Sequence, residues 1–270
     1  MSHSDFRTLE SADLLAALDT NMVGFWKPYG RGVGCKMQDA ADAVWIYTGV
    51  PHPLFNCVIR ASLPPNGIEA TRNTLQGLIR ERGAPVLWWV GPLSQPSDLG
   101  AALERSGLSA AGEAPGMAID LAALPAESEA IANFSVETVD SVAKQALWAR
   151  IAGVGTEFPP AAIDALARIE ATLDDPKYRA QRRYIGYLNG EPVASSALVL
   201  EAGVAGIYAV ATVPPARGKG IGRAMTALPL MQARGLGYRA GILQASSMGR
   251  PIYVHMGFRD VCTYRLYIQS

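Results

Sequence analysis

The sequence lacks the cysteine pattern of a disulfide framework or a structural zinc site. Only three cysteines, Cys35, Cys57 and Cys262, occur among 270 residues, and none belongs to a C-x-x-C pair. An odd and scattered set is typical of reduced thiols. We therefore expect neither disulfides nor a bound metal.

The chain also lacks an excess of one charge and any long apolar run. Lys plus Arg and Asp plus Glu each number 24, so the formal net charge is zero. This balance predicts neither a nucleic acid nor an anionic membrane as the main partner. Apolar runs such as residues 85–90 are too short to cross a bilayer, and the first residues lack the basic and apolar regions of a secretory signal. These features predict a cytoplasmic globular protein.

What the chain does contain is enough apolar material for a substantial core, since 49% of its residues are hydrophobic. Residues 122–134 mix Pro, Ser and Glu after a strand-like apolar run, as linkers between domains often do. We therefore predict an N-terminal domain at 1–121, a linker at 122–134 and a second domain at 135–270.

The second domain shows a clear alternation of strand and helix patterns. Asn189-Gly190 is the strongest hairpin signal of the chain, and it predicts an antiparallel pair on its two sides. The predicted strands are 135–138, 182–188, 192–200, 204–213, 238–245 and 258–268. The predicted helices are 139–152, 161–172, 220–233 and 251–256.

The first half contains a weaker repeat of the helix and strand pattern found at the end of the chain. There a helical stretch closes at Gly83, and the strand 86–90, the helix 99–105 and the strand 116–121 follow. The order matches the end of the chain, which suggests an internal duplication. Similar turn residues in two unrelated domains would produce the same pattern, so both interpretations stay open.

The segment Arg217-Gly218-Lys219-Gly220-Ile221-Gly222 has the features of an anion site. It lies between a predicted strand and a predicted helix, where unpaired backbone N–H groups and the helix dipole favour negative charge. Glycines let a phosphate approach the backbone closely, and the two basic side chains add charged donors. The segment therefore predicts a site for a phosphorylated ligand.

Three other interpretations of this turn compete. A P-loop would need Ser or Thr directly after Lys219, and Gly220 stands there instead. A dinucleotide fingerprint would need a third glycine where Arg223 stands, and it would need parallel strands rather than a hairpin before the turn. A glycine-rich turn without any ligand is the third alternative.

The surrounding residues resemble the GNAT N-acetyltransferase superfamily over residues 207–258. Arg217, Gly220 and Gly222 match the cofactor motif of that family, which is Arg or Gln, two residues, Gly, one residue, and Gly or Ala. Tyr253 precedes the pair Gly257-Phe258 by four residues, which matches a second landmark. The order of elements from residue 135 onward also follows that fold.

The resemblance implies an α/β fold of the α+β type, with a mixed, mostly antiparallel sheet flanked by helices. Since the first half echoes the second, two tandem GNAT-like domains are expected, the first of them degenerate or accessory. Residues 1–121 lack both landmarks. A copy of the fold there would have lost its cofactor site.

The resemblance also implies where acetyl-CoA would bind. The pyrophosphate would lie on the amides from Arg217 to Gly222, and the preceding strand would bind the pantetheine arm. Many family members carry an Asn where this chain has Ser246, so this hydroxyl is a candidate substitute. The expected cofactor-binding residues are Val210, Ala211, Thr212, Val213, Arg217, Gly218, Lys219, Gly220, Ile221, Gly222 and Ser246.

Two residues are candidates for proton transfer. The resemblance implies that Tyr253 protonates the leaving thiolate, whereas a core aromatic on an amphipathic helix is the alternative interpretation. Glu157 lies between the two early helices and is a candidate base, or equally a solvated loop acid. Tyr208 and His255 are weaker candidates.

These observations predict an acyltransferase that moves an acetyl group from acetyl-CoA to a primary amine of a small molecule or peptide by direct attack. A coenzyme A-binding sensor and a protein lysine or N-terminal acetyltransferase are the alternatives, and a homodimer stays open. An interdomain cleft is a usual place for a small-molecule site. We therefore expect the first half to cover the acceptor pocket with His52, Phe55, Asn56 or one tryptophan.

Overall fold

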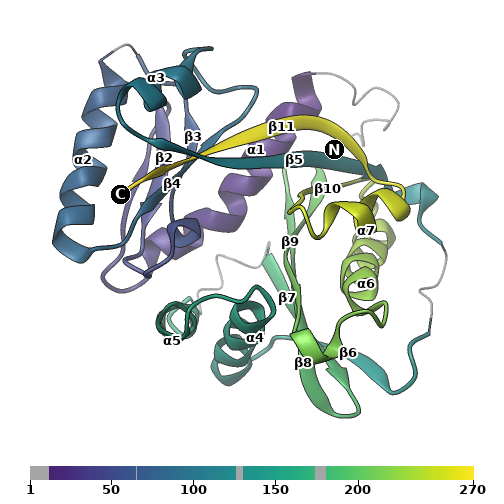
Figure 1. Cartoon of the computed structure of the whole chain (residues 1–270). Coiled ribbons are helices and arrows are strands. Elements are labelled where there is room, and N and C mark those ends of the chain that lie inside the picture. Colours follow the sequence, from purple (N-terminus) through teal and green to yellow (C-terminus); the bar gives the residue numbers. More distant parts are fainter. Residues whose placement is uncertain (1–11, 65, 126–129, 174–180) are drawn as a thin grey trace.

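The fold is a single mixed sheet with helices on both faces (Figure 1). The computed structural model describes residues 12–64, 66–125, 130–173 and 181–270. Within them eleven strands follow the order β1-β2-β3-β4-β11-β5-β10-β9-β8-β7-β6. All neighbouring strands are antiparallel except the pairs β3–β4 and β9–β10. The expected mostly antiparallel sheet flanked by helices is confirmed.

In the first half an initial helix is followed by three strands, and helices and strands alternate from there on. Gly83 ends α2 in the left-handed region, with φ at 74°, as glycine after a helix commonly does. The elements are α1 (Ala12–Trp26), β1 (Lys36–Asp39), β2 (Ala43–Tyr47), β3 (Asn56–Ala61), α2 (Gly67–Arg82), β4 (Val86–Val90), α3 (Leu99–Arg105) and β5 (Ser109–Asp120).

The second half follows the predicted order of elements, with ends that shift by a few residues. Ser141 caps α4 by accepting a hydrogen bond from the Lys144 N–H, which places the helix start three residues later than predicted. The elements are β6 (Phe134–Thr138), α4 (Val142–Gly155), α5 (Pro160–Glu170), β7 (Gln181–Leu188), β8 (Glu191–Glu201), β9 (Val204–Thr212), α6 (Ile221–Gly235), β10 (Ala240–Gln244), α7 (Arg250–His255) and β11 (Arg259–Gln269).

The two halves exchange their last strands. The strand β5 of the first half lies between β10 and β11, and β11 of the second half lies between β5 and β4. Figure 1 shows β5 and β11 running side by side across the junction. The division at residues 122–134 stays a prediction, and residues 126–129 of that linker lie outside the described part of the chain.

The topology of the two halves is consistent with an internal duplication. The first half contains the succession β3, α2, β4, α3, β5, and the second half contains β9, α6, β10, α7, β11. In each succession the first two strands form a parallel pair, which needs the helix as a crossover. The echo in the sequence therefore corresponds to a repeated arrangement of elements.

Side chains from both faces of the sheet form the core. Trp88 and Trp89 are adjacent on β4, and they contribute to two different apolar clusters because neighbouring strand residues point to opposite faces. No helix among the described residues is both long enough and apolar enough to span a bilayer.

A buried asparagine fastens helix α1 of the first half to the sheet of the second half. The side-chain amide of Asn21 donates hydrogen bonds to the backbone oxygens of Val199, Glu201 and Val204. Its side-chain oxygen accepts a hydrogen bond from the Tyr208 hydroxyl at 2.8 Å. These contacts place the C-terminal end of α1 over β9, next to the site described below.

Candidate active site

The parallel strands β9 and β10 diverge in the middle of the sheet. Only two residue pairs join them, Ala205 with Gly241 and Gly206 with Ile242. Beyond Gly206, β9 continues to Thr212 without a partner strand on that side. An opening is thus formed in which backbone groups on the edge of β9 are available to a ligand.

A bulge in β9 shapes one side of this opening. Ala209 has φ at 49°, which is unusual for a residue with a side chain. The register of β8 with β9 shifts here, because Tyr208 pairs with Ala197 whereas Ala211 pairs with Ser195. The Ser195 hydroxyl donates to the Ala209 carbonyl oxygen at 2.9 Å and holds the bulge. Bulges of this kind commonly redirect backbone groups next to active sites.

The glycine-rich turn follows β9 and leads into α6. Gly218 and Gly220 have φ at 76° and 78°, a left-handed backbone that strains any residue with a Cβ. Gly220 occupies the N-cap position of α6. Among the described residues, the N–H groups of Gly218, Lys219 and Gly220 have no backbone acceptor. The turn therefore presents several amide donors together with the positive end of a helix.

A cavity of about 730 Å³ extends from this turn to the edge of β9. Its charged side chains are Arg217 and Arg223, and no acidic residue lines it among those described. The amide donors of the turn and the N-terminus of α6 therefore favour an anion at this end of the cavity. It is lined by Gly155, Val210, Ala211, Thr212, Ala216, Arg217, Gly218, Gly220, Ile221, Gly222, Arg223, Ser246, Met248, Gly249, Pro251, Ile252, Tyr253 and His255. We call it the cofactor cavity.

Tyr253 lies on α7 at the inner end of the cofactor cavity. Its ring packs against Phe258 at a centroid separation of 5.7 Å. Burial raises the pKa of the Tyr253 phenol to about 12, and the neighbouring Thr226 hydroxyl acts in the opposite direction. The phenol therefore keeps its proton over the physiological range and can act as a proton donor.

A second cavity, of about 420 Å³, meets the cofactor cavity at the opening of the sheet. Val210, Ser246 and Tyr253 line both cavities. The second cavity extends beneath α1 and the turn before β3, so its walls come from both halves of the chain. We call it the acceptor cavity.

Comparisons with known proteins identify a family for part of the chain. A model of the family described as Acetyltransferase (GNAT) matches residues 154–258, which include the β9 edge, the glycine-rich turn and Tyr253. This segment is a GNAT acetyltransferase domain. A search of curated proteins finds no match.

Solved structures that resemble the whole chain share the fold of this GNAT domain and its partner half. A GCN5-related N-acetyltransferase from Kribbella flavida is 16% identical with a TM-score of 0.66, over 93% of this chain and 95% of that one. A tandem GNAT protein from the clavulanic acid biosynthesis pathway is 12% identical with a TM-score of 0.60, over 100% and 96%. At these identities the likeness establishes the fold alone.

The GNAT domain brings together nine of the eleven residues expected at the cofactor, all lining the cofactor cavity. Val213 and Lys219 are absent from this lining. The Val213 N–H donates to the Val193 carbonyl oxygen at 2.9 Å, so it is already used within the sheet. Lys219 instead lines a separate cavity of about 330 Å³.

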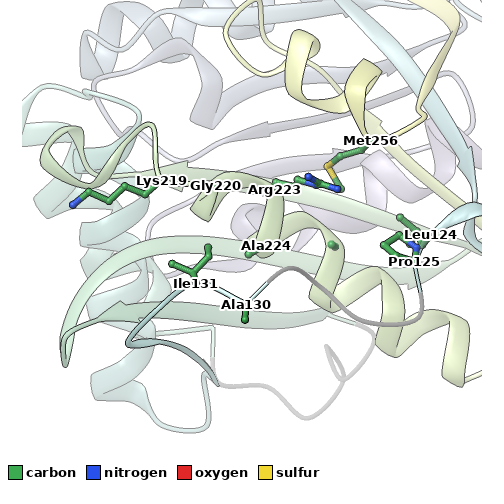
Figure 2. Close-up of a pocket in the computed structure, with 10 residues that line it drawn as sticks. Leu124, Pro125, Ala130, Ile131, Lys219, Gly220, Arg223, Ala224 and Met256 are labelled. Carbon is green, nitrogen blue, oxygen red and sulfur yellow. The ribbon is translucent and has the colours of Figure 1, made fainter.

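Figure 2 shows this separate cavity, which lies between the start of α6 and described parts of the linker. The side chain of Lys219 extends away from the cavity, whereas Arg223 lies close to Met256. Leu124 and Ile131 contribute apolar walls. The turn is therefore bordered by cavities on two sides, and Gly220 lines both of them.

Arg217 fastens the glycine-rich turn to its surroundings. Its guanidinium donates to the Thr212 carbonyl oxygen at 3.1 Å and to the Gly155 carbonyl oxygen at 2.9 Å. A third contact is an ion pair with Glu157 at 2.8 Å. Glu157 is 61% exposed at its side chain and does not line the acceptor cavity. The structure therefore places this candidate base beside Arg217 and outside the described lining of both cavities.

We expect Arg217→Ala to weaken acetyl-CoA binding by roughly 3- to 10-fold, because it removes hydrogen bonds worth about 1 kcal/mol each that hold the turn. Calorimetric titration of acetyl-CoA would measure the change. Arg150→Ala is a matched control, since Arg150 forms an exposed ion pair with Asp164 on neighbouring helices. Equal affinities of the two variants would show that the turn keeps its shape without the Arg217 guanidinium.

The other candidate residues differ in whether they line one of the two cavities. Tyr208 lines the acceptor cavity, but its hydroxyl donates to Asn21 and burial raises its pKa well above the ordinary value, which disfavours a base. His255 lines the cofactor cavity. His52 lies behind Phe158, with ring centroids 4.4 Å apart.

Of the residues expected from the first half, Phe55 lines the acceptor cavity and Asn56 does not. The Asn56 side chain binds the turn between β2 and β3, where its oxygen accepts from the Thr48 and Gly49 N–H groups. Trp26 and Trp89 line the cavity. The first half therefore contributes apolar walls to the cavity. Asn56 has a structural role, because it holds the turn between β2 and β3.

Sequence reasoning missed Gly155 at the end of α4. A Cβ at this position would lie 2.8 Å from the Ala211 Cβ and 3.0 Å from the Thr212 backbone nitrogen. Glycine here lets α4 approach β9 closely, and its carbonyl oxygen reaches Arg217. A glycine near a helix end gives no sign of this contact until the tertiary structure is known.

Proposed function

We propose that this chain transfers an acetyl group from acetyl-CoA to a primary amine. The observation that carries the proposal is the meeting of the cofactor cavity and the acceptor cavity at Val210, Ser246 and Tyr253. An acyl transferase needs such a meeting point, where the nucleophile and the thioester approach each other in a fixed orientation.

The residues of the cofactor cavity suit coenzyme A. Its pyrophosphate fits the amides between Arg217 and Gly222, because these amides lie at a helix N-terminus and two arginines adjoin them. The pantetheine arm fits the edge of β9 from Val210 to Thr212, where no strand pairs on the opening side. Ser246 borders both cavities and can supply a hydroxyl contact to that arm.

Tyr253 is proposed as the general acid. When the amine nitrogen attacks the thioester carbonyl carbon, a C–N bond forms and the C–S bond then breaks. The phenol of Tyr253 gives its proton to the departing sulfur, and the phenol is restored from the nitrogen through water. Its raised pKa keeps the donor protonated before each turnover.

Direct transfer is favoured over an acyl-enzyme intermediate. Cys262 is the nearest free thiol in sequence to the GNAT domain, and burial raises its pKa to about 11. A thiol in that state is a poor nucleophile near neutral pH. Cys262 is also absent from the described lining of both cavities. The amine itself is therefore the attacking group.

Two measurements on the wild-type protein test the proposed function. Calorimetric titration should show binding of acetyl-CoA, and incubation with a mixed panel of amines should release free thiol from it. Binding without thiol release by any acceptor would favour the sensing alternative. A folded protein that binds no acetyl-CoA would contradict the proposal.

A further inference from the structure

The acceptor cavity is rich in aromatic side chains. Nine of its 23 described lining residues are aromatic, and they come from both halves of the chain. They come from α1 and the turn after it, from the turn before β3, and from β4, α4, β9 and α7, with Phe158 just before α5. These aromatic residues are Phe25, Trp26, Tyr29, Phe55, Trp89, Trp148, Phe158, Tyr208 and Tyr253.

Six of these rings contact one another, namely Phe25, Trp26, Tyr29, Phe55, Phe158 and Tyr208. Phe25 stacks on Tyr208 with centroids 4.4 Å apart and an interplanar angle of 6°. Phe55 meets Trp26 at 5.9 Å and Phe158 at 5.4 Å, both edge to face. These contacts therefore join α1 of the first half to the strands and helices of the GNAT domain. A ligand in this cavity touches ring faces and edges on several sides.

The acceptor cavity has few charged residues in its described lining. Among the described lining residues, none is Lys, Arg or His, and Glu113 on β5 is the one with a formal charge. Without a cationic partner, a carboxylate on the ligand would lose its hydration and gain no ion pair. An ammonium group meets the opposite situation, because aromatic faces and a nearby acid attract it.

The polar groups of the two buried tyrosines of this lining are already engaged. The Tyr29 hydroxyl donates to the Glu170 carboxylate, and the Tyr208 hydroxyl donates to Asn21. Glu170 is itself fully buried and paired with Arg183. These phenols thus behave toward a ligand mainly as aromatic surfaces. Two other buried donors of the lining, the Trp89 indole N–H and the Gln244 side-chain amide, have no hydrogen-bond partner among the described residues, and both are neutral. The walls can therefore bind a neutral polar atom of a ligand, but among the described lining residues they offer no cation to a ligand carboxylate.

We infer that the acceptor is a hydrophobic primary amine without a carboxylate, of the arylalkylamine kind, and that both halves of the chain select it. This inference rests on the proposed acetyl transfer at the same opening. The apolar body of the amine lies among the rings, and its nitrogen lies toward Val210, Ser246 and Tyr253, where the two cavities meet. The volume of about 420 Å³ suits a small molecule.

The atoms of the proposed reaction balance without any further reactant. The acceptor arrives as R–NH₃⁺ and leaves as the amide R–NH–CO–CH₃, so its nitrogen loses two protons. One proton ends on the sulfur of free coenzyme A, after relay through Tyr253, and the other passes to solvent. The C–N bond forms as the C–S bond breaks, and nothing is oxidised or reduced.

Matched acceptors test the inference on the wild-type protein. Phenethylamine and phenylalanine differ by one carboxylate, and putrescine replaces the ring by a second ammonium group. We expect kcat/KM for phenethylamine to exceed that for each of the other two by at least about tenfold. Thiol release at fixed acetyl-CoA would measure all three, and calorimetry would establish separately that acetyl-CoA binds.

A variant that fills the cavity adds an independent test. Ala152 is buried on α4 and lines the acceptor cavity but not the cofactor cavity. We expect Ala152→Leu to raise KM for phenethylamine by about tenfold and to leave the Kd of acetyl-CoA unchanged. Ala101→Leu, at an exposed position of α3, is the control for a leucine that contacts neither cavity.

The outcomes separate the two claims. Preference for phenethylamine together with the effect of Ala152→Leu would support the inference. Better use of phenylalanine, putrescine or a lysine peptide would overturn it while leaving acetyl transfer established. Binding of acetyl-CoA with no transfer to phenethylamine would also overturn it. Failure of acetyl-CoA to bind would remove the proposed function itself.

Discussion

Gly220→Glu is expected to weaken acetyl-CoA binding by about 100-fold or more. The glycine has φ at 78°. A residue with a Cβ in this left-handed region loses about 1–2 kcal/mol of conformational energy. A carboxylate at the N-cap of α6 would also accept hydrogen bonds from the amides proposed for the pyrophosphate, and it would repel that group. About 2.7 kcal/mol of lost binding corresponds to this factor.

Calorimetric titration of acetyl-CoA would measure the loss for Gly220→Glu, and adding Gly222→Glu should deepen it. Gly235→Glu is the matched control, because Gly235 lies at the other end of α6, where an added Cβ meets no atom within 4 Å. The control is expected to bind as the wild type does. Wild-type affinity in the Gly220 variant would place the cofactor elsewhere.

Tyr253→Phe is expected to lower kcat by about 100-fold or more, with the Kd of acetyl-CoA changed little. Loss of a general acid typically costs this much in rate. Phenylalanine keeps the ring that packs against Phe258, so the local fold should persist. Steady-state thiol release would measure kcat, and calorimetry would measure binding. Tyr238→Phe is the control, since Tyr238 packs against the same apolar cluster and lines neither cavity.

The pH profile of the wild type gives a second test of Tyr253. Because its pKa is raised to about 12, the phenol loses its proton only as the pH rises toward that value. We therefore expect no fall of kcat between about pH 7 and 10 from this group. A steep loss within that range, absent from Tyr253→Phe, would mean that the phenol ionises earlier and that the assigned role is wrong.

The sequence could predict those features that depend on a few consecutive residues. The hairpin at Asn189-Gly190 is such a feature, because its turn residues favour one backbone geometry. The left-handed glycines Gly218 and Gly220 are another, since the helix start and the turn are determined locally. The position of Tyr253, four residues before Gly257, also needs only local order.

The ends of helices and strands, and the contacts of single residues, were harder to predict from the sequence. Glu157 lies in the expected loop between α4 and α5, but its pairing with Arg217 joins residues 60 positions apart. Val213 belongs to the expected strand, yet its N–H is bonded to Val193 and faces β8. Sequence spacing indicates which residues lie near a turn. It does not indicate which of two neighbouring strands a given N–H group meets.

The exchange of the last strands was beyond the reach of the sequence. The sequence predicts strands at 116–121 and 258–268, and both exist, the first as the end of a longer strand that begins at Ser109. Nothing in either pattern selects its partner, because backbone hydrogen bonds are the same in every pairing and only the packing of the whole sheet distinguishes them.

By itself, then, the sequence determined the order of elements in the second half, the glycine-rich turn and the tyrosine of the candidate site, all of which arise from local backbone preferences. The tertiary structure alone decided that α1 lies over β9 and that Trp26 and Phe55 reach the acceptor cavity. The physical reason is that burial of apolar surface is non-directional, so an aromatic residue shows that it will be buried but not against which partner.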